Sequence, residues 1–144
     1  MSIFIKKITS PDELRQCLAI RLKVFVEGQQ VPLAEELDGK DEESDHYLLT
    51  LQQLPVGVAR IRYLNNIAKV ERVAILPDYQ EQGLGKQLMQ GIISDLKRDK
   101  KINAIKLGAQ CHALIFYEKL GFKVCSDLYL DAGIPHKDMI LELE

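Results

Sequence analysis

The chain has 144 residues, 47% of them hydrophobic and 28% charged, with a formal net charge of −2. This balance predicts one soluble domain, residues 1–144, and argues against a basic surface that would bind nucleic acid or an anionic membrane. No apolar run reaches the roughly 18 residues of a membrane-spanning helix, and the N-terminal sequence lacks the features of a signal peptide. Cys17, Cys111 and Cys125 have no C-x-x-C spacing, which argues against a disulfide framework or a metal site and favours a reduced, cytoplasmic setting.

The N-terminal strand, residues 3–8, is followed by a helix with a strong start signal. Ser10 and Glu13 form a capping box around Pro11, which suits the first helical position. The pattern predicts a helix over residues 11–25. Its expected inner face consists of Leu14, Leu18, Leu22 and Phe25.

The rest of the chain predicts strands that alternate with two helices. The predicted strands are residues 46–51, 56–64, 68–76, 104–110, 122–125 and 137–143. The longer helix begins at residue 84 and ends at about residue 100, with an apolar stripe of Leu84, Leu88, Met89, Ile92, Ile93 and Leu96. A short helix within residues 112–122 ends at Gly121, a C-terminal glycine of the left-handed type. Residues 27–45 and 126–136 are expected to be irregular, and the whole is a mixed α/β or α+β domain.

Residues 80–86, QEQGLGK, follow a predicted strand and open the longer helix. Backbone N–H groups at such a helix start bind anions. A P-loop would need glycine at position 80 and serine or threonine at position 87, where glutamines stand, and a Rossmann fingerprint would need a third glycine in place of Leu88. The segment does fit Q/R-x-x-G-x-G/A through Gly83 and Gly85, for which a plain turn is the alternative interpretation.

The surroundings of this loop resemble the GNAT superfamily of N-acetyltransferases, whose acetyl-CoA loop has this pattern. The shared features are VAILP at residues 73–77, the helix and strand after the loop, and an F-Y-x-x-x-G-F motif at residues 116–122. RLKVFVEGQQVP, ELDGKD and GIPHKDM extend the likeness over nearly the whole chain and are similar to the ElaA-like or YjcF-like branch. The resemblance implies a twisted, mostly antiparallel mixed sheet with helices on both faces, splayed open where acetyl-CoA enters. It also implies direct transfer of the acetyl group to a primary amine.

The same resemblance assigns cofactor-binding positions. Val73 and Ile75 match the strand edge that hydrogen-bonds the pantetheine arm through its main chain, although ordinary strand core explains them equally well. The remaining matching positions are Gln80, Gln82, Gly83, Leu84, Gly85 and Lys86 in the pyrophosphate loop, and Gln110, where many members have asparagine. Gln80 replaces a frequent arginine and Glu81 a frequent glycine, so we expect weakened acetyl-CoA binding, partly offset by Lys86.

Tyr117 matches the family's usual general acid. A phenol, with a pKa of about 10, is protonated at neutral pH and can hydrogen-bond or protonate the leaving sulfur, whose thiol has a pKa of about 8.5. The alternative interpretation is that Phe116 and Tyr117 are two aromatic core residues. Strand alternation places Glu71 on the face of Val73 and Ile75, where it would act as a base through water; pairing with Arg72 or Arg60 is the structural alternative. His46 and His136 match positions typical of the branch and are candidates for the acceptor pocket, with solvated loop histidines as the alternative.

Residues 35–45 are rich in carboxylates, which would steer a cationic amine acceptor or form a solvated loop. The acceptor itself, a small molecule or a peptide, is not specified by the sequence. A non-catalytic acyl-CoA binder or sensor is the alternative function, and an interaction module without cofactor is a third. The family also makes a homodimer plausible.

Overall fold

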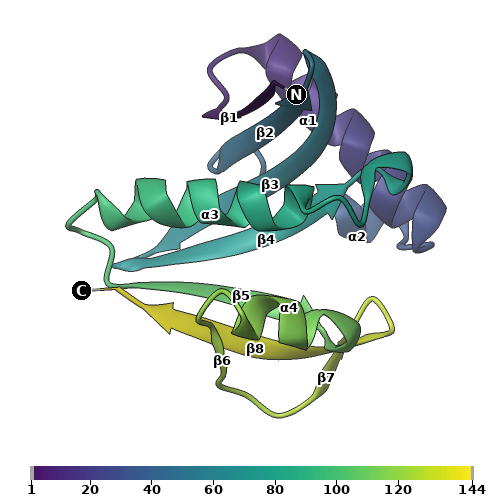
Figure 1. The fold of residues 1–144 in the computed structure, drawn as a ribbon. Helices are drawn as coiled ribbons and strands as arrows, with labels where there is room; N and C mark the ends of the chain where they lie inside the picture. Colours follow the sequence, from purple (N-terminus) through teal and green to yellow (C-terminus); the bar gives the residue numbers. More distant parts are fainter. Residues whose placement is uncertain (1, 144) are drawn as a thin grey trace.

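The computed structural model describes residues 2–143 and consists of a sheet covered by helices (Figure 1). The strands are β1 (Ile3–Lys7), β2 (Asp45–Leu51), β3 (Leu54–Leu64), β4 (Ile67–Ile75), β5 (Ala104–Gln110), β6 (Lys123–Val124), β7 (Tyr129–Asp131) and β8 (Ile134–Glu142). The helices are α1 (Pro11–Arg21), α2 (Leu33–Glu36), α3 (Leu84–Lys97) and α4 (Leu114–Glu118). Shorter helical segments are the π-helix η1 (Leu22–Gly28) and the 3₁₀ turns η2 (Pro77–Tyr79) and η3 (Cys111–Ala113).

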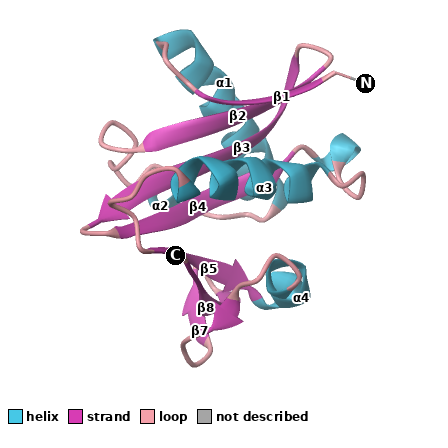
Figure 2. Cartoon of the chain, turned by 60° about the vertical axis from the view of Figure 1, so that its left-hand side comes forward, coloured by secondary structure: helices cyan, strands magenta, loops and turns pink. Residues whose placement is uncertain are grey.

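The strands form one sheet in the order β1-β2-β3-β4-β5-β8-β6, with β7 paired to β8. All neighbours are antiparallel except β4 and β5. The core on one face joins α3 and Tyr117 of α4 to the sheet, and a smaller cluster on the other face joins α1 and η1 to it. Figure 2 shows α3 and α1 on opposite sides of the strands. This arrangement confirms the predicted mixed sheet with helices on both faces.

The predicted apolar stripe of α3 is confirmed, because all of its members are buried, and so is the left-handed Gly121 at φ 104°. Ser10 caps α1 as predicted, by accepting a hydrogen bond from the Glu13 N–H. The predicted inner face of that helix is only partly right: Phe25 packs against the smaller cluster and Leu14 and Leu18 are half-buried, but none of the four is fully buried. The buried residues are Cys17, Ile20, Arg21 and Val24, whereas Leu22 is 41% exposed. Arg21 is buried because it forms ion pairs. A prediction based only on apolar residues therefore could not place Arg21 on the inner face.

Two expected irregular segments contain regular structure. Residues 27–45 include α2, and residues 126–136 include β7 and the start of β8. β7 and β8 are joined by a tight turn in which Ala132 and Gly133 both have positive φ, 51° and 76°. Such a turn suits a two-residue hairpin, but an alanine at its first position gives no sequence signal for it.

A β-bulge in β4 creates the opening of the sheet. The register against β3 shifts between the pairs Val58–Ala74 and Arg60–Glu71, and Arg72, with φ 55°, lies in the bulge. β4 pairs with β5 only from Ile67 to Val70. Beyond Val70 the two strands separate, as the gap between them in Figure 1 shows, so the β5-facing edge of β4 has no strand partner.

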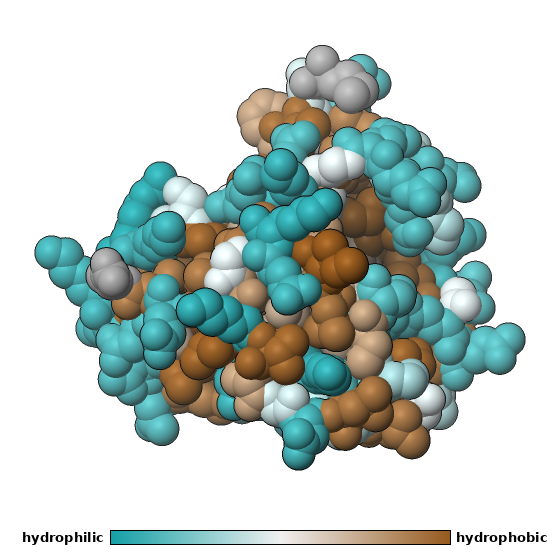
Figure 3. Space-filling model, turned by 60° about the horizontal axis from the view of Figure 1, so that its bottom comes forward, coloured by the Kyte–Doolittle hydropathy of each residue, from teal (hydrophilic) through white to brown (hydrophobic). Residues whose placement is uncertain are grey.

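Apolar side chains are exposed at the end of the molecule formed by α4, β6 and β7. Figure 3 brings this end forward and shows brown side chains gathered among hydrophilic ones. The exposed apolar residues there are Ile115, Val124, Leu128 and Leu130. They lie outside the set of residues that lines the cleft described next.

Candidate active site

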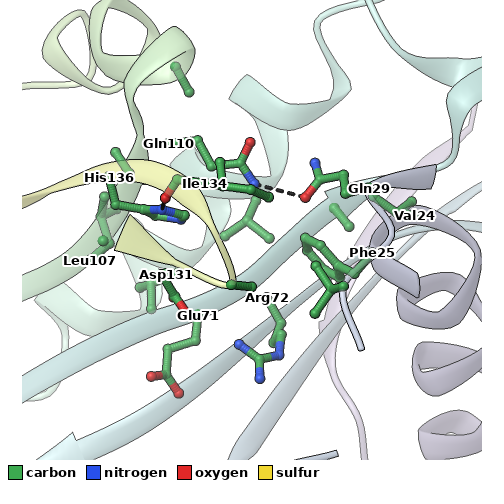
Figure 4. A pocket seen from close by; sticks show the side chains of 18 of the residues that line it. Val24, Phe25, Gln29, Glu71, Arg72, Leu107, Gln110, Asp131, Ile134 and His136 are labelled. Carbon is green, nitrogen blue, oxygen red and sulfur yellow. Dashed lines mark hydrogen bonds between the residues drawn. The ribbon is translucent and has the colours of Figure 1, made fainter. Parts of the chain in front are cut away.

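A cleft of about 490 Å³ occupies the opening between β4 and β5. Because the sheet is split there, the cleft has walls from both faces. On the α3 side it is lined by Val73, Ile75, Gly85, Phe116 and Tyr117, which we call the cofactor half. On the other side it is lined by Val24, Phe25, Gln29, Glu35, Glu71, Arg72, Asp131, Ile134 and His136, the acceptor half, much of which Figure 4 shows.

The start of α3 provides unpaired backbone donors at the cofactor half. Gly83 is the N-cap with φ 78°, a left-handed conformation that favours glycine. The first helical hydrogen bond runs from the Gln87 N–H to the Gly83 carbonyl, so the N–H groups of residues 84–86 have no acceptor within the helix. The site that a Cβ at Gly83 would occupy is open. These features suit a phosphate group.

The predicted cofactor residues divide into two sets. Val73, Ile75, Gln80, Gly85 and Gln110 line the cleft, whereas Gln82, Gly83, Leu84 and Lys86 do not. Leu84 is buried in the core, so only its backbone faces the loop. The Gln80 side chain donates from Nε2 to the Ile75 carbonyl at 2.9 Å, and Glu81 has φ 65°. A left-handed conformation at position 81 explains why glycine suits it.

Tyr117 of α4 is 9% exposed and contributes to the wall of the cleft. Burial raises the pKa of its phenol to about 12, which keeps the hydroxyl protonated near neutral pH. Among residues 2–143 its hydroxyl has no hydrogen-bond partner. The raised pKa makes this phenol a weaker acid than an exposed one, but its unengaged hydroxyl beside the cleft can hydrogen-bond a sulfur there. The general-acid role of Tyr117 stays a prediction.

Glu71 lies on the opposite side of the sheet from Val73 and Ile75. The expectation that they share a face is wrong because the bulge at Arg72 reverses the alternation: Val73 and Ile75 pack against the α3-side core, whereas Glu71 pairs with arginines on the other face. Figure 4 shows Glu71 among the acceptor-half residues.

The Glu71 carboxylate is fully engaged. Oε1 accepts from Arg60 Nη2 and Arg62 Nε, both at 2.7 Å, and Oε2 accepts from Arg62 Nη2 at 3.0 Å. Burial alone would raise the pKa of Glu71, but the hydrogen bonds from Arg62 and Arg60 lower it to about 2. A carboxylate with so low a pKa is a weak proton acceptor, so this geometry favours the structural alternative and pairs Glu71 with Arg60, not with Arg72.

Part of the acidic stretch pairs with buried arginines, whereas Glu35, Glu42 and Glu43 are exposed, as the solvated-loop interpretation expects. Arg21 and Arg60 are each 1% exposed. Arg21 pairs with Glu36 and Asp41, both at 2.7 Å, while Arg60 also pairs with Asp38 and Asp41. A hydrogen bond from Arg60 is the main cause of the lowered pKa of Asp38.

We call this group the arginine–carboxylate network, with Arg21, Arg60, Arg62, Arg72, Glu36, Asp38, Asp41 and Glu71 as its members. The Arg72 Nε lies 2.7 Å from Glu36 Oε2 but is not aligned for a hydrogen bond, so the contact is electrostatic. The four arginines and four carboxylates of the network balance one another, whereas Glu35 and Asp131 at the cleft are exposed carboxylates outside it. Sequence reasoning offered the Glu71–Arg60 pair as an alternative but missed the rest of the network, because arginines in β3 and β4 carry no signal for a partner in α2.

The acceptor half brings together residues from distant parts of the chain. Gln110 Nε2 donates to Gln29 Oε1 at 2.9 Å across the cleft, a bond drawn in Figure 4. His136 lines the cleft, whereas His46 is buried elsewhere with Nε2 2.9 Å from the Asp41 carbonyl. Of the two histidines proposed from the sequence for the acceptor pocket, His136 is therefore the one at the cleft, which His112 of η3 also lines. Gln29 lies in the RLKVFVEGQQVP segment noted in the sequence but was not singled out there, and Asp131 has no motif that could have identified it.

Within residues 2–143 no cluster of three or more His, Cys, Asp and Glu side chains is arranged to hold a metal ion. No helix in this range is long and apolar enough to cross a membrane.

Comparison with known proteins agrees with the fold and the cleft. Residues 6–143 match the acetyltransferase (GNAT) domain family. The uncharacterized N-acetyltransferase YjcF of Bacillus subtilis is 35% identical over 90% of this chain and 92% of its own length. The crystal structure of Escherichia coli ElaA superposes with a TM-score of 0.87 at 26% identity, covering 96% of this chain and 99% of that one. An acyl-CoA N-acyltransferase from Pseudomonas aeruginosa superposes with a TM-score of 0.84 at 27% identity, covering 96% and 97%.

The chain therefore belongs to the GNAT family of acetyltransferases, and the resemblance inferred from the sequence is confirmed. The family uses acyl-CoA as its acyl donor, and the free N–H groups at the start of α3 together with the unpaired edge of β4 fit such a donor.

Proposed function

We propose that this protein transfers the acetyl group of acetyl-CoA to a primary amine of a small molecule or a peptide. The observation that carries the proposal is the cleft at the β4–β5 opening, which extends from the start of α3 to side chains on the opposite face of the sheet. Such a passage lets two substrates meet from opposite sides of the sheet, which direct transfer requires.

In this proposal the N–H groups at the start of α3 hold the pyrophosphate, with Gln82, Gly83, Leu84, Gly85 and Lys86 as the surrounding residues. The open β4 edge at Val73 and Ile75 holds the pantetheine arm through its main chain, and Gln80 and Gln110 border it. Tyr117 donates a proton to the sulfur as the thiolate leaves. Glu71 holds Arg60 and Arg62 in place beneath the acceptor half and does not take the proton of the acceptor amine.

A Tyr117→Phe variant tests catalysis against mere binding. The account predicts that turnover, followed by thiol release with a panel of primary amines, falls about 100-fold, the usual contribution of a general acid. The dissociation constant for acetyl-CoA, measured by calorimetry, stays within about threefold, since the ring and its packing remain. Phe116→Leu serves as the control for aromatic packing, because Phe116 lies in the same wall but has no proton to give.

The alternative is a non-catalytic acyl-CoA binder or sensor. It would bind acetyl-CoA and release no thiol with any amine, and Tyr117→Phe would change neither quantity. A cytoplasmic location, a single domain over residues 1–144 and a homodimer remain predictions. Size-exclusion chromatography with light scattering tests the last of these, and the exposed apolar residues of α4, β6 and β7 are the first surface to substitute.

A further inference from the structure

His136 projects from β8 into the acceptor half of the cleft. It is 8% exposed and lies opposite Gln110 in the β5–β8 register, on the strand next to the β4–β5 opening. Figure 4 shows its ring within the cleft wall, near Gln110 and above Asp131. A side chain so placed can meet an acceptor that approaches from this face.

One hydrogen bond fixes the tautomer of His136. Its Nδ1 lies 2.7 Å from the Ile134 carbonyl oxygen. A carbonyl oxygen only accepts hydrogen bonds, so Nδ1 must be the donor, and in the neutral ring the lone pair then stays on Nε2. Among residues 2–143 Nε2 has no hydrogen-bond partner. The neutral imidazole is thus oriented with its proton-accepting nitrogen free.

The ring is also held from the side. Tyr129 stacks on it, with ring centroids 5.8 Å apart and an interplanar angle of 23°. The Tyr129 hydroxyl in turn donates to Asp138 Oδ1 at 2.6 Å. Gly108 leaves room for this pair, because a Cβ there would come within 2.5 Å of the Tyr129 hydroxyl oxygen. A small residue is needed opposite the Tyr129–His136 stack.

Other titratable groups at the acceptor half are less suited to accept a proton. The charged and titratable residues that line it besides His136 are Glu35, Glu36, Lys69, Glu71, Arg72, Tyr129 and Asp131. Glu36 and Glu71 are paired with arginines, whereas Glu35 and Asp131 are exposed carboxylates, which are weak bases near neutral pH. Of the two imidazoles that line the cleft, His112 is exposed in η3, beside α4, whereas His136 is buried in the wall of the acceptor half.

We propose that His136 is the general base of the acetyl transfer, taking a proton from the acceptor amine through Nε2. This inference rests on the proposed function. The ammonium form of the acceptor loses one proton to Nε2, and the resulting nitrogen lone pair forms a bond to the thioester carbonyl carbon. The carbon–sulfur bond then breaks, and the sulfur takes a proton from Tyr117. The second nitrogen proton returns to the Tyr117 phenolate through solvent, and the imidazolium releases its proton to solvent.

The tautomer is measured first, on the unmodified protein and without any acceptor. Long-range proton–nitrogen NMR correlation of the histidine rings above neutral pH distinguishes a protonated Nδ1 from a protonated Nε2. The proposal predicts protonated Nδ1 and unprotonated Nε2 for His136. A ring protonated at Nε2 overturns it.

Kinetics then test the role itself, with 2-phenylethylamine, spermidine, glucosamine and an alanine-terminated peptide as acceptors. In His136→Gln, kcat falls about 100-fold or more and the acidic limb of the pH profile of kcat/KM disappears, while acetyl-CoA affinity changes less than about threefold. Added imidazole restores part of the turnover of His136→Ala. Lys137→Gln, on the opposite side of β8, is the matched control and keeps wild-type turnover.

The two proposals fail differently. If His136→Gln retains kcat within about threefold of the unmodified protein, or if imidazole does not rescue His136→Ala, His136 is not the base and the transferase assignment stands. If the unmodified protein binds acetyl-CoA but acetylates none of the amines, the proposed function fails, and the role of His136 fails with it.

Discussion

The two halves of the cleft are built from different chemical groups, one mainly from backbone atoms and the other from side chains. The cofactor half is made mainly of backbone: the free N–H groups at the start of α3 and the open edge of β4. The acceptor half is made of side chains from η1, α2, β4, β7 and β8, and it rests on the arginine–carboxylate network. A backbone site tolerates most side-chain changes around it, whereas a side-chain site depends on each of its partners.

This difference predicts that the two halves fail in different ways. Substitutions in the network should cost stability before they affect cofactor affinity, and substitutions in the glycine loop should do the reverse. The bulge at Arg72 separates the two halves, because it places Val73 on the α3 side and leaves Glu71 on the other. Each prediction below tests one half against the other.

The largest effect is expected for Arg60→Met. Arg60 is buried and donates to Asp38, Asp41 and Glu71, so its removal takes one cationic partner from each of three partly buried carboxylates. Breaking a buried pair costs about 3–5 kcal/mol of unfolding free energy, measured by chemical denaturation. Arg15→Met is the control, because Arg15 pairs with Asp12 on an exposed helix face and its loss should cost at most about 1 kcal/mol. Equal losses in the two variants would contradict a buried, coupled network.

Acid should weaken the same network. The folded-state pKa of Glu71 is about 2 against an ordinary value of 4.5, so the stabilisation is complete above about pH 4.5 and is lost as the pH falls towards 2. Burial alone would raise the pKa of Asp41, but hydrogen bonds from Arg21 and Arg60 lower it. Asp41 therefore also stabilises the folded state less as the pH falls. Denaturation at about pH 6, 4.5 and 2.5 should show a loss on the order of 3 kcal/mol from Glu71 over this range. Arg60→Met should reduce the slope, and an unchanged slope would exclude the network as its source.

Gly85→Glu tests the cofactor half. Gly85 lines the cleft, and a Cβ there would lie 3.6 Å from Phe116 Cζ, so glutamate fits sterically but brings a negative charge to the anion site. Like charges in contact cost several kcal/mol, so the acetyl-CoA dissociation constant should rise about 100-fold or more in calorimetry. Gln90→Glu adds the same charge farther along α3 on an exposed side and should change it less than about threefold. Unfolding free energy should be nearly equal in both variants; a large loss in Gly85→Glu alone would point to misfolding instead.

The smallest effect is expected for Glu81→Gln. This change removes the negative charge near the helix start but keeps a non-glycine residue at φ 65°. A charge near a helix end is worth about 0.3–1 kcal/mol at an exposed site, so acetyl-CoA should bind about two- to fivefold more tightly at low ionic strength. The gain should vanish in high salt. Glu81→Gly removes the left-handed strain as well; if only this second variant gains affinity, conformation and not charge limits binding.

The cofactor half could be predicted from the sequence because its signal is local. Gly83 and Gly85 at the start of an apolar-striped helix define a backbone geometry on their own, and Tyr117 follows in a short motif. The acceptor half could not be predicted in the same way. The bulge at Arg72 reverses the alternation of β4, so that each later residue faces the opposite side of the sheet from the one predicted. No residue type in VERVA, residues 70–74, indicates a bulge.

Most of the arginine–carboxylate network could likewise not be predicted from the sequence. Its ion pairs join α1, α2, β3 and β4 over many residues of sequence separation, so composition alone made residues 35–45 resemble a solvated acidic loop. Burial of Arg21 also displaced the predicted inner face of α1. The β7–β8 hairpin holds His136 in the cleft. It could not be predicted because its turn begins with Ala132, a residue that does not indicate a hairpin turn.

The central claim is that acetyl-CoA occupies the half of the cleft formed by the start of α3 and the open edge of β4. Backbone amide NMR of the protein, recorded with and without saturating acetyl-CoA, tests it most directly. The account predicts the largest shifts at residues 73–75 and 83–86, with smaller ones at residues 131–136. Shifts confined to the acceptor half, or none at millimolar acetyl-CoA, would contradict it.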